Sequence, residues 1–161
     1  MLAANLDAWA VLPAMMPRQI IHVDYVVSNV LLQGSAVSGV LDFEFAAPDY
    51  RAMELAGALS SFALGNRLEA ADWPLIEALT ASCFTMVRFR EEELRSMPVM
   101  LMRRYIVSFI HRAGRWREGL SSREHVIERW TDLMWLQAWL ASFGSELVDR
   151  LIRVANYPPS A

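Results

Sequence analysis

The hydrophobic pattern of the chain changes at about residue 51, and this change limits the folds that the chain can adopt. Before that point the apolar residues form short β-branched runs, which are typical of strands. After it they recur at helical spacing almost to the end of the chain. The sequence therefore predicts helices at 51–64, 73–90, 98–117 and 122–155.

Several residues indicate where these helices begin or bend. Asp72 and Pro74 are typical of a helix start, and Ser121 with Glu124 has the spacing of a capping box. Gly144 lies inside the last segment and is expected to break or bend that helix. The single cysteine, Cys83, falls in an apolar helical pattern, which indicates a small core residue.

The part before residue 51 is predicted to be a small β element. Strands are expected at 19–23, 30–33 and 37–42, with a turn at 34–36. Loops are expected at 24–29 and at 43–50, the second because it carries Pro48 and Asp49. The pattern also favours a short helix at 2–12, and the tail at 156–161 is expected to be disordered.

Together these elements predict an α+β, mainly α-helical fold. At 161 residues the chain is long enough for one domain with a core and too short for two full lobes of an enzyme. We therefore expect a single domain over 1–161, with a β-containing region at 18–64 and a helical bundle at 65–155.

Charge and hydropathy exclude several classes of partner. The net charge of −3 argues against a nucleic-acid binder, which would normally carry a basic stripe. The sequence opens without the pattern of a signal peptide, and its longest uncharged run, between Asp24 and Asp42, is too polar for a membrane helix. A cytoplasmic protein with no membrane partner is expected.

Polar side chains interrupt the apolar run IIHVDYVVSNVLL at residues 20–32. His22, Asp24 and Asn29 lie where the first strand gives way to a loop, and Asp42 ends the third strand. If these strands are neighbours, two carboxylates and an amide converge on one cleft, and such oxygen ligands suit Mg²⁺ with a substrate phosphate. This arrangement is what phosphoryl transfer needs, since one carboxylate can deprotonate the attacking hydroxyl while the other groups hold metal.

Simpler interpretations of these residues remain open. Asp24 and Asn29 are also common turn residues, because their side chains bond to nearby backbone groups. His22 is favoured as a core or bracing residue over a catalytic one. A zinc site is disfavoured, because such sites recruit several His or Cys ligands and only His111 and His125 remain, both in helical segments.

The runs HVDYVVSNVLL and VSGVLDFEFAAPDYRAMELAGAL together resemble the C-terminal lobe of the aminoglycoside phosphotransferase and choline kinase family. That family includes the type II homoserine kinases and has a protein-kinase-like fold. The resemblance covers about residues 18–64. It implies a kinase-like C-terminal lobe in which a small β-hairpin carries the catalytic and metal loops, with ATP and Mg²⁺ as cofactors and a small-molecule hydroxyl as the phosphate acceptor.

The resemblance assigns a role to each of five residues. Asp24 would be the catalytic base that faces the acceptor hydroxyl. Asn29 and Asp42 would be the magnesium ligands that hold the nucleotide. His22 would brace the loop, and Glu54, where the family usually has aspartate, would anchor the loop by accepting backbone hydrogen bonds.

The chain also departs from the family pattern. Val23 replaces the glycine that is usual between the histidine and the aspartate. The sequence has fifteen basic residues, all arginines, so the family's phosphate-clamping lysine and the N-terminal lobe that carries it are not in this sequence.

Two hypotheses follow from the missing lobe. The chain is either the catalytic half of a kinase whose other lobe is encoded separately, with little or no activity alone, or a truncated, non-catalytic binding or assembly module. Both predict an exposed apolar face and self-association, in line with a hydrophobic content of 55%.

Two patterns in the helical part have competing interpretations. The stretch RRYIVSFIHRAGRWREG at 103–119 could line an anionic substrate pocket, but its helical spacing favours arginines on a solvated face. The aromatic residues at helical spacing near the C-terminus are favoured as core over a ligand site. They are Trp130, Trp135, Trp139 and Phe143.

Overall fold

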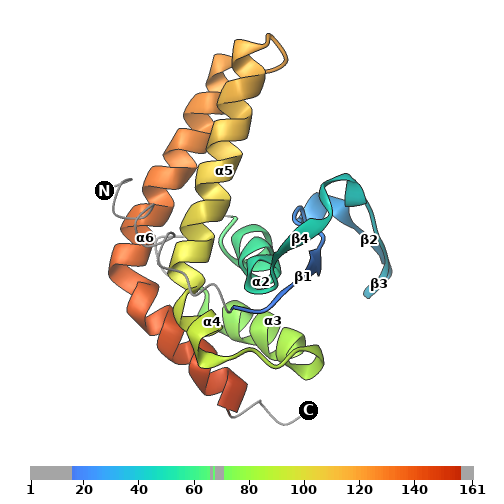
Figure 1. Cartoon of the computed structure of the whole chain (residues 1–161), viewed down its shortest axis with the longest axis vertical. Coiled ribbons are helices and arrows are strands. Elements are labelled where there is room, and N and C mark those ends of the chain that lie inside the picture. The colour runs from blue at the N-terminus through green and yellow to red at the C-terminus, as the bar shows by residue number, and fades with distance from the viewer. Residues whose placement is uncertain (1–15, 66, 68–70, 157–161) are drawn as a thin grey trace.

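The structure is a computed structural model that describes residues 16–65, 67 and 71–156 (Figure 1). The helix expected at 2–12 lies outside the described residues, as does the tail after Asn156. The described part of the chain is mainly helical with a small β part, as the sequence predicts. None of its helices is long and apolar enough to cross a membrane.

Helices form in each of the four segments that the sequence predicts after residue 50. They are α2 (Ala52–Ala58), α3 (Trp73–Met86), α5 (Met97–Arg117) and α6 (Arg123–Asn156). A short π-helix, η3 (Leu59–Ala63), continues α2. The predicted end of α3 at residue 90 is wrong, because the backbone is already extended at Val87. A short helix, α4 (Glu91–Arg95), was not predicted.

The side chains that cap two of these helices can be compared with the prediction. Asp72 caps α3 as expected, since its Oδ1 accepts a hydrogen bond from the Leu75 N–H at 3.1 Å. The predicted cap of α6 is wrong by one residue. Ser122, not Ser121, accepts a hydrogen bond from the N–H of His125, at 3.3 Å.

The β part has four strands in two separate antiparallel pairs. They are β1 (Arg18–Ile21), β2 (Val30–Gln33), β3 (Ala36–Val40) and β4 (Ala47–Tyr50). β2 and β3 form the expected hairpin, which turns at Gly34 with a φ of 63°, a left-handed conformation that glycine adopts without strain. Two 3₁₀ turns, η1 (Val27–Asn29) and η2 (Phe43–Phe45), precede β2 and β4.

The expected loop at 43–50 is wrong for its second half, which is β4. This strand pairs with β1, with Arg18 opposite Tyr50 and Ile20 opposite Pro48. Proline cannot donate a hydrogen bond to a sheet, but it is tolerated in an edge strand. Both strands of a two-stranded sheet are edges, so Pro48 does not prevent this pairing.

α5 and α6 run side by side for most of their length, and α2 lies between this pair and the strands (Figure 1). The β2–β3 hairpin projects farthest from the helices. α6 is not broken at Gly144 but changes direction along its length. The helical part is therefore the scaffold on which the β part is mounted.

The hydrophobic core lies among the helices. Its fully buried side chains include Leu55, Leu59, Met97, Leu101, Leu133, Leu136, Leu147 and Leu151. Cys83 packs against this core, as expected. Trp135, Trp139 and Phe143 also belong to it, whereas Trp130 is 42% exposed and only partly fits the predicted aromatic core.

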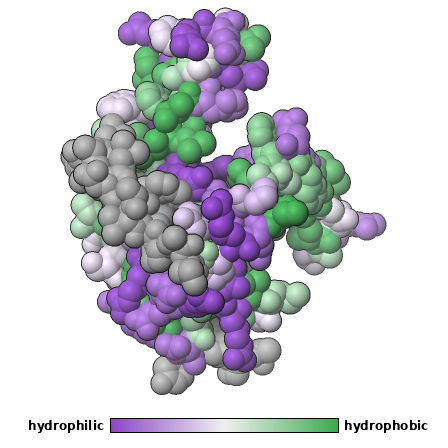
Figure 2. All heavy atoms as spheres, in the orientation of Figure 1, coloured by the Kyte–Doolittle hydropathy of each residue, from purple (hydrophilic) through white to green (hydrophobic). Residues whose placement is uncertain are grey.

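The β part contributes little to the core. Within residues 18–50 only Ile21 and His22 are buried. The same segment exposes many apolar side chains, which contribute to the green surface of the projecting hairpin in Figure 2. They are Ile20, Val27, Leu31, Leu32, Val37, Leu41, Phe43 and Phe45.

Arg51 links the end of β4 to α4 through a buried carboxylate. The Glu93 side chain is completely buried, and Arg51 donates to it from Nε at 2.9 Å and from Nη2 at 2.7 Å. These hydrogen bonds raise the pKa of Arg51. The Arg90 N–H donates to the same carboxylate at 2.9 Å, so α4 and the start of α2 share one buried charge.

We predict that Arg51→Met lowers the free energy of unfolding by about 3 kcal/mol, because the Glu93 carboxylate stays buried without its cation. Arg95→Met is the matched control, since it removes an exposed ion pair with Glu91 on the same short helix and should change stability by less than about 1 kcal/mol. Urea unfolding measures both changes. Equal losses in the two variants would contradict the assigned role of Arg51.

Candidate functional site

The segment HVDYVVSN connects β1 to η1, and its first residue is fixed to the end of the hairpin. His22 is buried, and its Nε2 lies 2.7 Å from the carbonyl oxygen of Leu41. Because a carbonyl oxygen only accepts, Nε2 carries the hydrogen and donates it. The imidazole also packs on Phe43, with ring centroids 4.4 Å apart. His22 therefore holds the loop beside the residues that flank Asp42.

Val23 has a backbone conformation that is rare for its residue type. Its φ is 69°, in the left-handed region, where a β-branched residue is strained by about 1–3 kcal/mol. The N–H of Val23 donates to Oε2 of Glu54 on α2 at 3.2 Å. The carbonyl oxygen of Val23 accepts from Nη1 of Arg104 on α5 at 2.8 Å. Side chains from two helices thus hold both polar groups of this strained residue.

Asp24 follows Val23 and lies in contact with Arg104 and Asn29. Nη2 of Arg104 donates to Oδ1 of Asp24 at 2.8 Å. The side-chain nitrogen of Asn29 donates to the Asp24 backbone carbonyl at 3.0 Å and to Oδ2 at 3.3 Å. With its nitrogen directed to Asp24, Asn29 keeps its side-chain oxygen available as a ligand.

Asp42 follows Leu41, the residue that lies across the hairpin from Asn29. The Leu41 N–H donates to the Asn29 carbonyl oxygen at 2.8 Å, next to the Val30 and Val40 pair that begins the β2–β3 ladder. Asp42 is exposed and has a φ of 65°. The structure thus brings His22 and the Asp24–Asn29 pair close to the residue that precedes Asp42.

One amide oxygen and one exposed carboxylate form a donor set that fits Mg²⁺, which usually keeps several waters and substrate phosphate oxygens as its other ligands. In the described part of the chain no three His, Cys, Asp or Glu side chains cluster as a metal site. The oxygen donors of Asn29 and Asp42 are of the chemical type that Mg²⁺ prefers.

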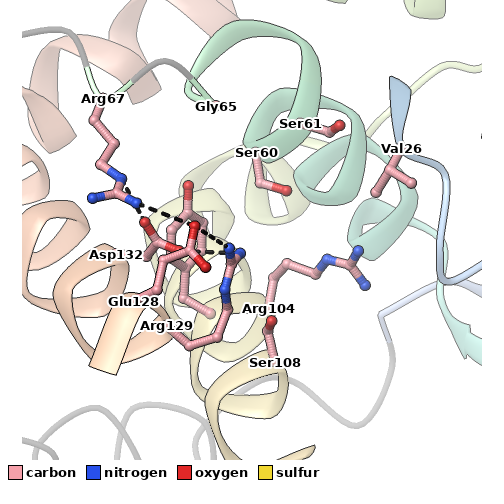
Figure 3. A pocket seen from close by; sticks show the side chains of 11 residues that line it. Val26, Ser60, Ser61, Gly65, Arg67, Arg104, Ser108, Glu128, Arg129 and Asp132 are labelled. Atoms are coloured by element: carbon pink, nitrogen blue, oxygen red, sulfur yellow. Dashed lines mark ion pairs between the residues drawn. The ribbon is translucent and has the colours of Figure 1, made fainter. Parts of the chain in front are cut away.

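A cavity of about 280 Å³ lies beside this loop, among η3, α5 and α6 (Figure 3). Its lining includes Val26 from the loop, the hydroxyl residues Ser60, Ser61 and Ser108, the ring of Tyr105, and the charged residues Arg67, Arg104, Glu128, Arg129 and Asp132. Arg104 belongs both to this lining and to the contacts of Asp24. The cavity therefore adjoins the loop, through Val26 in its lining and through the Arg104 guanidinium that contacts Asp24.

The charged wall of the cavity is an ion-pair network. Arg67 pairs with Asp132, and Arg129 contacts both Glu128, at 3.1 Å, and Asp132, at 3.0 Å (Figure 3). Burial of the Tyr105 hydroxyl, together with the charge of the buried Asp132, raises the pKa of Tyr105 to about 12. The network gives the cavity both signs of charge within a small volume.

Arg104 and the charged cavity wall were not among the site residues predicted from the sequence. The preferred interpretation of 103–119, a solvated face, is wrong for Arg103 and Arg104. Their side chains are half-buried and pair with Asp49 and Asp24. The arginine-rich pattern was a usable signal, but helical spacing alone does not say which arginines turn inward.

Glu54 is a partly buried carboxyl whose environment favours the neutral form. Burial raises its pKa, and this effect outweighs the Val23 N–H and the nearby charges of His22 and Arg104, which lower it. The carboxyl that holds the loop backbone is therefore harder to ionise in the folded chain than in the unfolded chain.

The raised pKa predicts how Glu54 changes stability with pH. Near the ordinary value of 4.5 the unfolded chain loses this proton before the folded chain does, so the contribution of Glu54 falls as pH rises through the folded-state pKa. Glu54→Gln cannot titrate. The free energy of unfolding of the wild type minus that of the variant should thus be larger at about pH 4 than at about pH 7. A difference that grows with pH would contradict this.

Comparisons with known proteins identify the family of the chain. A model of the "phosphotransferase enzyme family" matches residues 2–91, which include the loop, the hairpin and α2. The homoserine kinase of Zymomonas mobilis subsp. mobilis is 46% identical over 44 residues. That match covers 27% of this chain and only 14% of the kinase. Because the family model covers more than half of the 161 residues, the chain belongs to the phosphotransferase enzyme family.

Proposed function

We propose that the chain is the catalytic half of an ATP-dependent phosphotransferase that acts on a small-molecule hydroxyl. In this proposal it forms the C-terminal lobe of a kinase-like fold, and the hairpin carries the catalytic and metal loops. The observation that carries the proposal is the contact of Asn29 with Asp24 at the base of the hairpin that leads to Asp42.

Asp24 is the catalytic base in this proposal. Its carboxylate takes the proton of the acceptor hydroxyl while that oxygen forms a bond to the γ-phosphorus of ATP and ADP leaves. The contacts from Arg104 and Asn29 keep the carboxylate in one orientation before the acceptor arrives. Such positioning is most of what a protein contributes to this reaction.

Asn29 and Asp42 would hold Mg²⁺, with the amide oxygen of Asn29 and the carboxylate of Asp42 as its protein ligands. The bound ion neutralises charge on the nucleotide phosphates. Asn29 can serve this role and contact Asp24 at the same time, because its nitrogen and its oxygen are separate groups.

The acceptor would lie in the cavity that is lined by Arg104, the residue that contacts Asp24. Serine hydroxyls, paired arginines and paired carboxylates line this space, which suits a small acceptor that carries polar and charged groups. Homoserine is the first acceptor to test, because a homoserine kinase shares part of this sequence. Choline, aminoglycosides and sugars are the comparison set.

The proposal includes a second component that covers ATP and carries a lysine, since this sequence has none. The exposed apolar residues of the β part, among them Leu32 and Phe43, support docking of such a lobe or self-association of the chain. A non-catalytic binding or assembly module is the alternative. Val23 precedes Asp24 and has a strained backbone, so a change in its conformation that moves the Asp24 carboxylate away from the acceptor would favour the non-catalytic module.

We predict that Asp24→Asn lowers Mg²⁺-dependent transfer from ATP by at least about 100-fold, because the base is lost and the shape is kept. The assay uses the full chain, alone and with the polypeptide encoded next to it, against the acceptor set. Asp149→Asn is the control, because Asp149 is an exposed residue of α6 that lies far from the loop in the sequence. Absence of transfer in both preparations, or an unchanged rate in Asp24→Asn, would favour the non-catalytic alternative.

We predict that Asp42→Asn weakens metal binding by at least about tenfold. Removing a group that only hydrogen-bonds to a metal ligand already lowers metal affinity by about this factor, and Asp42 is a direct ligand in the proposal. Mn²⁺ serves as the probe, because its paramagnetism broadens the NMR signals of nearby residues. Broadening at residues 29 and 42 should need more Mn²⁺ in Asp42→Asn and the same amount in Asp149→Asn. If the wild type, Asp42→Asn and Asp149→Asn all need the same Mn²⁺ concentration for this broadening, Asp42 is not a metal ligand.

A further inference from the structure

We propose that Arg104 is a positioning residue for phosphoryl transfer, which fixes both the backbone and the carboxylate of the Asp24 segment. This inference rests on the proposed function, because it takes Asp24 to be the catalytic base. Arg104 acts through Asp24 and needs no contact with a reacting atom.

Arg104 contacts two consecutive residues with two different nitrogen atoms. Nη1 donates to the carbonyl oxygen of Val23 and Nη2 donates to Oδ1 of Asp24, both at 2.8 Å. A planar guanidinium with two such bonds fixes the direction of its partners as well as their distance, which the ammonium group of lysine cannot do. The side chains of Arg104 and Asp24 are 20% and 31% exposed, so water screens this pair only partly.

The strained backbone explains why a positioning residue is needed here. Val23 is left-handed, and such conformations persist only where the surroundings hold them. Glu54 holds its N–H from α2, and Arg104 holds its carbonyl from α5. Without Arg104 the carbonyl is free to turn, and Asp24 turns with it.

The two carboxylate oxygens of Asp24 differ in their hydrogen-bond partners. Oδ1 accepts the charged hydrogen bond from Arg104, whereas the one hydrogen bond to Oδ2 from the described residues is the 3.3 Å contact from Asn29. Oδ2 is therefore the oxygen that takes the proton. A displacement of about 1 Å at such an atom is enough to lower a rate by about 100-fold.

Arg103 provides a matched control on the same helix. It also pairs with a half-buried aspartate, since its Nη1 donates to Oδ2 of Asp49 at 2.8 Å. Arg104→Ala and Arg103→Ala each remove one inter-element ion pair. Only the first should release the Asp24 segment, so hydrogen exchange at the amides of residues 23–25 should rise at least about tenfold in Arg104→Ala and little in Arg103→Ala.

Activity gives the second readout, measured on the full chain under the conditions of the Asp24 test. Arg104→Ala should lower kcat by about 100-fold and leave KM for ATP within about threefold, because positioning of the base affects the chemical step. Guanidinium, well below the concentration that unfolds the protein, should restore part of the rate in Arg104→Ala, and methylammonium should not. Arg104→Lys should keep less than about a tenth of the rate.

The outcomes separate this inference from the proposed function. Loss of transfer in Asp24→Asn with a wild-type rate in Arg104→Ala overturns the inference and leaves the function standing. A wild-type rate in Asp24→Asn overturns both. Equal exchange and equal rates in Arg104→Ala and Arg103→Ala overturn the inference, because Arg104 would then only stabilise the fold.

Discussion

The segment that carries the candidate site is held by polar contacts rather than by the hydrophobic core. Only Ile21 and His22 are buried between residues 18 and 50, so apolar burial cannot fix this part of the chain in one place. The loop itself is held by the hydrogen bond that Glu54 accepts from Val23 and by the one that Arg104 donates to Val23. Such contacts are directional, and they set the orientation of Asp24 in a way that apolar packing does not.

The helices supply the fixed points for these contacts. Burial of leucine and methionine side chains among α2, α5 and α6 makes a rigid scaffold, and Glu54 and Arg104 project from two of these helices. At the end of the β part, Arg51 and the buried Glu93 tie the start of α2 to α4. The site is thus an exposed hairpin and loop whose polar groups are held against a packed helical body, with the cavity beside the loop.

Local patterns are sufficient to predict the longer helices and the residues of the loop, but not the short helix α4. The change to helical spacing indicates the helical segments, and the spacing of His22, Asp24 and Asn29 identifies the loop. The errors arise where tertiary contacts override local preference. Pro48 favours a loop, but residues 47–50 form a strand because they pair with β1. The helical spacing of Arg103 and Arg104 favours exposed side chains, but both are half-buried because they pair with Asp49 and Asp24. No local pattern predicts that Arg104 serves both Asp24 and the cavity, because that requires residues 80 positions apart to meet.

The central claim is that Asp24, Asn29 and Asp42 support transfer of phosphate to a hydroxyl rather than only keeping the shape of a family member. Phosphorus NMR of the chain, with the polypeptide encoded next to it, in ATP, Mg²⁺ and each acceptor of the set in turn, beginning with homoserine, observes this directly. With at least one acceptor, a phosphomonoester signal should grow as the γ-phosphate signal of ATP declines. Spectra in which ATP stays intact with every acceptor, or yields only inorganic phosphate with every acceptor, would contradict the claim.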